Sequence, residues 1–118
     1  MMTPEQIYEA IEPSKLRGLT MDIALRRVAL DLVVVNGGTE RAHSLSFEGV
    51  SSLSLKRPPT ADWNYVELSE IVIEPSNELQ DHLRFWAELW TDASLEIHAE
   101  RVLFDDSEVR AASGLTGA

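Results

Sequence analysis

Glu96, His98 and Glu100 stand at alternate positions near the C-terminal end of the sequence, and they are the residues whose types and spacing could carry chemistry. Successive side chains of a β-strand point to opposite faces, so these three would share one face of a strand. An imidazole between two carboxylates can ligate a divalent metal ion, or serve as a general base whose tautomer the carboxylates fix. The same alternation is typical of the solvent face of a half-exposed strand, so it assigns no catalytic residue by itself.

The segment from His82 to Phe104 predicts a β-hairpin that contains these residues. Apolar side chains alternate with polar ones on both sides of a polar break, at Leu83, Phe85, Ala87 and Leu89 and then at Leu95, Ile97 and Ala99. For the two apolar sets to share one face, the numbers of paired residues must sum to an even number, which requires an odd-length loop such as residues 92–94. The opposite face then carries Trp86, Glu88, Trp90, Glu96, His98 and Glu100.

We predict that this second face is a binding surface, because tryptophans among carboxylates suit a basic, partly apolar partner protein. An alternative stays open, in which an N-terminal helix covers both indoles through Ile7, Tyr8 and Ile11. A second alternative concerns residues 77–90, where Leu79, Leu83, Trp86 and Trp90 also fall at helical spacing after a possible cap at Ser76. We favour the strand, because the alternation is strict and the next strand needs an antiparallel neighbour.

Other residues and motifs give little support for an enzyme. His43 is expected opposite Leu32 as a packing histidine, and His82 stands alone. The sequence contains no G-x-S-x-G turn, phosphate-binding loop, dinucleotide fingerprint or H-E-x-x-H pair. We therefore expect no cofactor, and we favour a function other than catalysis.

Composition narrows the classes of partner. The 118 residues include 20 acidic and 10 basic side chains, with a net charge of -10, which argues against nucleic acid as a partner. Lys15, Arg17, Arg26 and Arg27 form the one local group of basic residues, which we expect to compensate acidic neighbours. No apolar run approaches the roughly 20 residues of a membrane span, the first ten residues lack signal-peptide features, and cysteine is absent. We expect a cytoplasmic bacterial protein.

The remaining chain predicts a short N-terminal helix followed by strands. Thr3, Pro4 and Gln6 are typical of a capped helix start, so residues 3–12 are expected to form a helix that acts as a lid or clasp. A strand segment from residue 20 to 35 should turn at Gly37 and Gly38, which places Val28, Leu30 and Val35 opposite Phe47, Leu45 and Glu40. Further strands are expected at 50–55 and 66–74, after a bulge or turn at Glu48 and Gly49. Trp63 and Tyr65 should pin the loop between these two strands to the body.

The expected fold is mainly β, with about six antiparallel strands in a small sandwich or partly open barrel and the short N-terminal helix. Residues 1–106 would form a single domain, and residues 107–118 would be a flexible tail.

The order of four segments resembles small bacterial β-proteins of the YxiG-like group: ALDLVVV, SLSFEGVSSLSL, ELSEIVI and FWAELWTDASLEIHAERV. In that group an F-x-x-V pattern follows the second strand and a hairpin ends the chain, and the match here covers roughly residues 25–104. The resemblance implies a protein of toxin loci, an immunity-type inhibitor without enzymatic activity. It carries over no binding residue.

These observations leave three hypotheses of different classes. The leading one is a protein-binding module, in the form of an immunity-type inhibitor of a basic toxin. The second is a small metal-dependent or acid–base enzyme that uses Glu96, His98 and Glu100. The third is a structural protein that forms a homodimer or larger homo-oligomer, with Trp86 and Trp90 buried between subunits.

Overall fold

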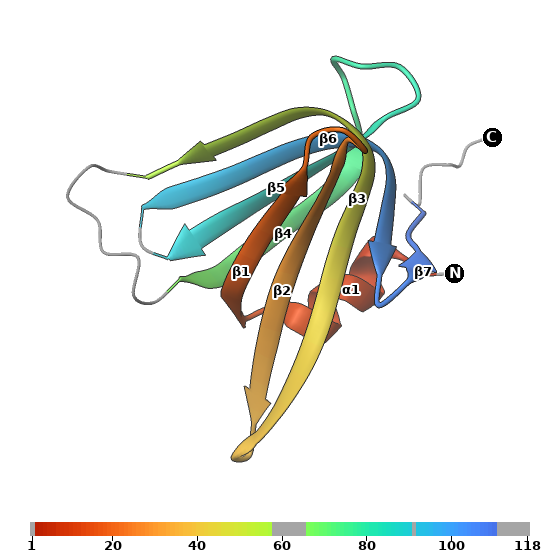
Figure 1. Ribbon diagram of the computed structural model, residues 1–118. Coiled ribbons are helices and arrows are strands. Elements are labelled where there is room, and N and C mark those ends of the chain that lie inside the picture. Colours follow the sequence, from red (N-terminus) through yellow and green to blue (C-terminus); the bar gives the residue numbers. More distant parts are fainter. Residues whose placement is uncertain (1, 58–65, 91, 111–118) are drawn as a thin grey trace.

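The computed structural model describes residues 2–57, 66–90 and 92–110, and it is mainly β, as predicted. In these ranges one helix and seven strands follow in the order α1 (Pro4–Ile11), β1 (Ser14–Asp22), β2 (Arg27–Asn36), β3 (Thr39–Lys56), β4 (Glu67–Pro75), β5 (Leu83–Trp90), β6 (Ala93–Phe104) and β7 (Ser107–Glu108). The strands form one sheet in the order β3-β2-β1-β4-β5-β6-β7, and every strand pair in it is antiparallel (Figure 1).

The sheet curls back on itself because β3 also pairs with β6. On the other side of the ring β1 and β4 meet only at Ser14↔Leu68 and Lys15↔Glu67 and then separate. The sheet therefore encloses the core as an incomplete ring rather than as a closed barrel or two separate sheets. The core includes Phe47 and Phe85, which meet edge to face with their ring centroids 5.0 Å apart.

The β2–β3 hairpin has the register that the sequence predicts. Val35 pairs with Glu40, and Leu30 pairs with Leu45. The register between β3 and β6 shifts between Val50 and Ser52, just after the expected position, and Gly49 has a φ of 66° in the left-handed region that favours glycine. The sequence analysis was wrong to end a strand there, because β3 continues through this bend to Lys56.

Strand β1 was missed by the sequence analysis, which expected one strand segment from residue 20 to 35 to follow the helix. Ser14–Asp22 forms a strand that turns at residues 23–26 and pairs with β2. Its register shifts between Leu16 and Gly18, so Arg17 has no partner residue in β2. A strand that contains a bulge does not show the clean alternation that sequence reasoning needs.

Helix α1 starts as predicted, with Thr3 and Gln6 forming a reciprocal capping box. The helix is a core element and not only a clasp, because Ile7 and Ile11 are fully buried. Side chains of the helix and of its C-cap residue Glu12 also bind the edge of β4 where β1 has separated from it. The Ile73 amide donates to the Tyr8 hydroxyl at 3.1 Å, and the Ile71 amide donates to a Glu12 carboxylate oxygen at 2.6 Å. The helix thus fills the gap that β1 leaves in the ring.

Residues 83–90 form a strand, so the helical alternative for this segment is wrong. Strands β5 and β6 pair with an even sum of residue numbers, as in Phe85↔Ile97, and Phe85, Leu89, Leu95 and Ile97 are fully buried as predicted. The loop lies two residues earlier than expected, because Leu89 pairs with Ala93. A shift of two preserves which side chains share a face.

The folded part of the chain extends beyond residue 106, where a flexible tail was expected to begin. Strand β7 pairs with the end of β6, Val109 is buried, and the Met2 amide donates to the Glu108 carbonyl at 3.0 Å. Residues 111–118, and the predicted packing of Trp63 and Tyr65, lie outside the described residues. The described part of the chain contains no helix long and apolar enough to cross a membrane.

Candidate functional site

The outer surface of β4, β5 and β6 carries most of the residues that the sequence singled out. Register places them in rows that run across the strands, since paired residues lie side by side on one face. The rows are Glu74, Arg84 and His98; Val72, Trp86 and Glu96; and Glu70, Glu88 and Ser94. Trp90 lies beyond the last row, opposite Glu67. The two ends of this surface differ in chemistry.

At one end His98 is enclosed by hydrogen bonds, with only 3% of its side chain exposed. Its Nε2 lies 2.7 Å from Glu96 Oε2, and its Nδ1 lies 2.9 Å from Ser76 Oγ. Ser76 Oγ also accepts the amides of Glu78 and Leu79, at 3.1 and 3.0 Å. The segment after β4 therefore folds over this histidine.

These contacts identify the tautomer of His98. Both lone pairs of the Ser76 oxygen receive backbone N–H groups, so its hydroxyl hydrogen is the one left to bond with the imidazole. The hydroxyl donates to Nδ1, and Nε2 carries the proton that is donated to Glu96. The imidazole is a structural link between the β4–β5 loop and β6.

Arg84 completes this end of the surface. Its guanidinium bonds Glu96 at 3.2 Å and Glu74 at 3.0 Å. The hydrogen bond from His98, followed by that from Arg84, lowers the pKa of Glu96 below its ordinary value of 4.5. Burial alone would lower the pKa of Arg84, but the hydrogen bonds and charges of Glu96 and Glu74 raise it overall. The cluster is a satisfied network of opposite charges.

The predicted metal or acid–base triad is only partly assembled. Glu78, and not Glu100, joins Glu96 and His98, with ligand atoms within 4.8 Å of one another. Glu100 belongs to the bend instead, because a side chain added at Gly49 would collide with its carboxylate. Arg84 already supplies a cation beside Glu96, and the proton on His98 Nε2 occupies the nitrogen that a metal would need. The geometry favours a structural network over a metal centre.

The other end of the surface is open. Trp90 is 55% exposed, and Trp86 is half-buried between Val72 and Glu96 of the neighbouring strands. Helix α1 does not cover the indoles in the way the alternative prediction required, since Ile7 and Ile11 are buried in the core and Tyr8 bonds the edge of β4.

Glu70 and Glu88 give this open end its charge. They are paired residues on β4 and β5, both are exposed, and neither has an ion pair with a described residue. Two carboxylates directly opposite each other on a sheet repel. Sequence reasoning identified Glu88 but missed Glu70, because the register shift between Leu68 and Glu70 hides which face Glu70 takes. It also missed the roles of Arg84 and Ser76, which can be identified only from their contacts with Glu96, Glu74 and His98 in the folded structure.

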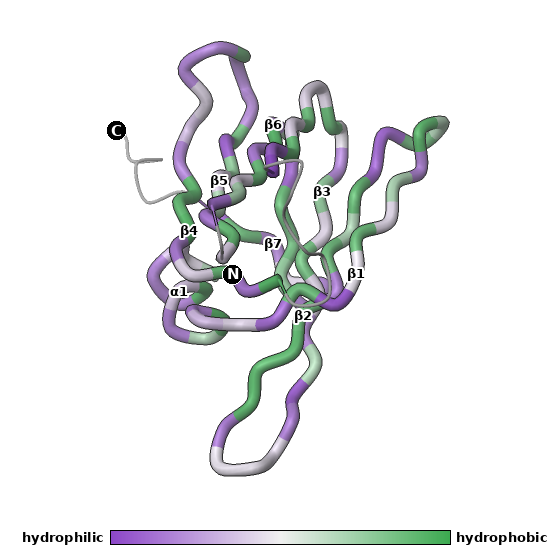
Figure 2. The backbone as a smooth tube through the Cα atoms, turned by 90° about the vertical axis from the view of Figure 1, so that its left-hand side faces the viewer, coloured by the Kyte–Doolittle hydropathy of each residue, from purple (hydrophilic) through white to green (hydrophobic). Residues whose placement is uncertain are grey.

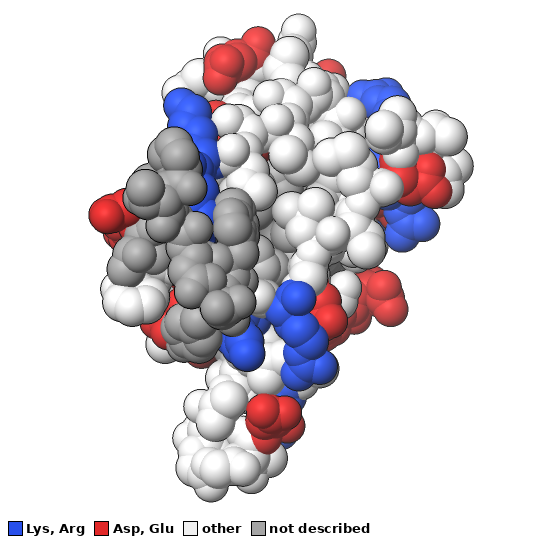
Figure 3. Space-filling view, turned by 60° about the vertical axis from the view of Figure 1, so that its left-hand side comes forward, with Lys and Arg blue, Asp and Glu red and all other residues white. Residues whose placement is uncertain are grey.

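A separate apolar feature lies at the β1–β2 turn. Met21, Ile23 and Leu25 are 49%, 81% and 61% exposed, and Figure 2 shows hydrophobic residues at the tip of this hairpin. The nearby basic residues are engaged locally, since Arg26 bonds Ser51 at 3.0 Å and Arg27 lies 3.9 Å from Glu48. Figure 3 shows Lys and Arg side chains at several separate places on the face that it draws.

The comparisons with known proteins add no family to this description: no family model matches the sequence, and a search of curated proteins returns no match.

Proposed function

We propose that this protein is a non-enzymatic protein-binding module, and that it docks on a basic partner through Glu70, Glu88 and Trp90. These three residues are called the acidic tryptophan surface below. The observation that carries the proposal is the exposed Glu70–Glu88 pair beside the exposed indole of Trp90.

The pair is costly for the isolated protein. Facing like charges on adjacent strands destabilise a sheet by roughly the 0.2–1 kcal/mol that favourable cross-strand pairs contribute. A basic side chain placed between the two carboxylates would replace this repulsion by two attractions. If the partner also buried the indole of Trp90, this residue would be typical of those that dominate binding energy at protein interfaces.

The hydrogen bonds and packing of the rest of the outer surface support this role. Arg84, Glu96 and His98 are joined by hydrogen bonds, and Trp86 packs between β4 and β6 beside them. A surface that is already ordered loses little conformational entropy on binding. At the open end, Glu70 and Glu88 are the charges that have no ion pair with a described residue.

The charge also selects the class of partner. Two copies of a chain with net charge -10 would bring their carboxylates together, which disfavours a homodimer through this surface. A basic protein, in contrast, is attracted electrostatically as it approaches this acidic chain. The specific form that we propose is an immunity-type inhibitor, whose acidic surface occupies the basic cleft of a toxin.

The test is a titration with the basic proteins encoded beside this gene, using the wild type and two variants. Trp90→Ala should weaken binding by about tenfold or more, and the double variant Glu70→Gln, Glu88→Gln should weaken it and reduce its salt dependence. The matched control is Glu5→Gln, Glu40→Gln, which removes the same charge from exposed residues elsewhere. Equal losses in the control would reduce the effect to net charge and contradict a defined docking surface.

A further inference from the structure

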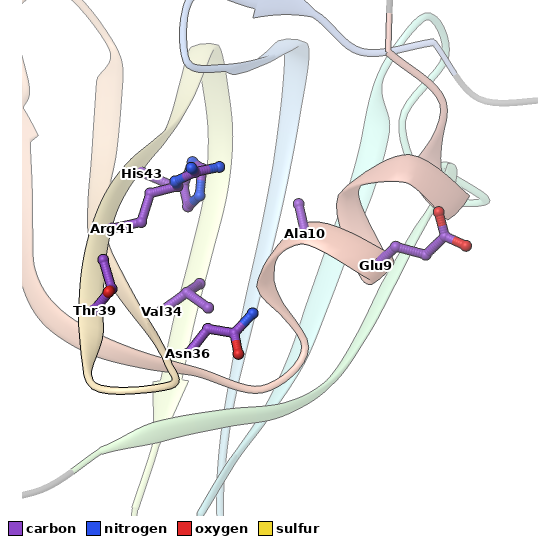
Figure 4. Close-up of a pocket in the computed structure, with 7 residues that line it drawn as sticks. All are labelled: Glu9, Ala10, Val34, Asn36, Thr39, Arg41 and His43. Carbon is purple, nitrogen blue, oxygen red and sulfur yellow. The ribbon is translucent and has the colours of Figure 1, made fainter.

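A cavity of about 420 Å³ lies between α1 and the projecting end of the β2–β3 hairpin (Figure 4). Alternation along β2 and β3 places Val34, Arg41 and His43 on the same side of the hairpin as the buried Leu32. This is the face of the sheet that covers the core, continued past the end of the core. Ala10 of α1 forms the opposite wall.

The hairpin side of the cavity carries polar side chains, and one of them, Arg41, has no acidic partner among the described residues. The Arg41 side chain is exposed and has no ion pair with a described residue, in a chain with twice as many acidic as basic residues. Glu9 lines the cavity, but its carboxylate points away from the hairpin, while Arg41, His43 and Asn36 project toward the helix (Figure 4). A guanidinium can bind a carboxylate through two parallel hydrogen bonds.

His43 is fixed in position by residues from the other end of the chain. Its Nδ1 lies 2.7 Å from Asp105 Oδ2, and its ring stacks on Phe104 with centroids 5.1 Å apart. Asp105 is held in turn, since its Oδ1 accepts the Ser44 amide at 2.8 Å. The ionised carboxylate requires the proton on Nδ1, so Nε2 of the neutral ring is a hydrogen-bond acceptor.

Arg41 and His43 therefore bind different groups of a ligand. Arg41 takes a carboxylate, and His43 Nε2 takes a hydroxyl hydrogen. Val34 and Ala10 offer apolar contact for the carbon skeleton between and beyond them. We propose that this cavity is a binding site for a small hydroxycarboxylate, independent of the acidic tryptophan surface.

The test uses the full chain and NMR titration with mandelate, with phenylacetate, which lacks only the hydroxyl, and with inorganic phosphate. Mandelate should shift the amide signals of residues around Val34, Arg41 and His43, and bind several-fold more tightly than phenylacetate. Arg41→Gln should weaken mandelate at least tenfold. The matched control Arg17→Gln, at an exposed arginine on β1 outside the cavity, should leave the affinity unchanged.

His43→Phe separates the two contacts while keeping an aromatic ring against Phe104. It should abolish the preference for mandelate over phenylacetate and leave phenylacetate binding unchanged. The proposal is overturned if mandelate produces no shifts around the cavity, or if Arg41→Gln leaves its affinity intact. Equal binding of mandelate, phenylacetate and phosphate would mean an adventitious ion only, and would also overturn it.

Discussion

The charged residues on the outer surface divide into those that pair with an opposite charge and those that do not. Glu96, His98 and Arg84 form a closed set of hydrogen bonds, whereas Glu70 and Glu88 face each other without an ion pair to any residue that the structure describes. The sequence predicted that Glu96 and His98 share a face, but it could not predict Arg84 between two glutamates from neighbouring strands. Whether an acid is paired depends on cross-strand register, which shifts at three places in the described strands.

The low pKa of Glu96 makes one contribution to stability depend on pH. The folded state keeps this carboxylate ionised below the ordinary pKa of 4.5, because His98 and Arg84 bond it. The contribution is therefore present above that value, and it is lost as the pH falls through the lowered folded pKa. Urea unfolding should show Glu96→Gln to be less stable than wild type near neutral pH, with the gap shrinking in acid. A gap that is independent of pH would contradict the role given to Glu96.

Removing the charge of one unpaired glutamate should stabilise the protein, whereas Glu96→Gln should destabilise it. Glu70→Gln should raise the free energy of unfolding by about 0.2–1 kcal/mol, since it ends the repulsion by Glu88. The gain should fall with added salt, which screens exposed charges. Glu40→Gln, at an exposed glutamate that pairs with Val35, is the control and should change little. A loss of stability in Glu70→Gln would show that Glu70 has a favourable partner.

At the scale of elements, the sequence predicted the strands with regular apolar alternation and missed the places where a bulge or bend interrupts that alternation. The β2–β3 register followed from the glycine turn and matched apolar residues, and the β5–β6 faces followed from parity alone. Strand β1, with its bulge at Arg17, and the continuous β3 through Gly49 were not predicted, because each breaks the alternation. Glu100 was misassigned for the same reason, since it lies at that bend.

The helix was predicted from its cap, but its role depends on contacts with β4 that are distant in sequence. Tyr8→Phe should lower the free energy of unfolding by about 1–3 kcal/mol, because the Ile73 amide loses its acceptor in a partly buried place. Glu12→Gln keeps an acceptor for the Ile71 amide and should cost less than Glu12→Leu. Chemical denaturation of the three variants measures this order. Equal stability of Tyr8→Phe and wild type would mean that the helix does not cap the β4 edge.

The whole molecule separates its features in space. The apolar β1–β2 turn lies at the far end of β1 from Lys15, which pairs with Glu67 near Trp90. The cavity lies on the inner side of the projecting hairpin, whereas the acidic tryptophan surface lies on the outer side of β4 and β5. Composition predicted a net acidic protein, but the position of its unpaired glutamates required the register between β4 and β5.

The central claim is that Trp90 and its neighbouring glutamates contact a basic partner, and ¹⁹F NMR of 5-fluorotryptophan-labelled protein tests it most directly. The three tryptophans give three signals, which Trp→Phe variants assign. The signal of Trp90 should be solvent-sensitive in the free protein, and it should move and lose that sensitivity when the basic partner binds, while Trp86 changes little. A bound complex in which the Trp90 signal is unchanged and still solvent-sensitive would contradict the claim.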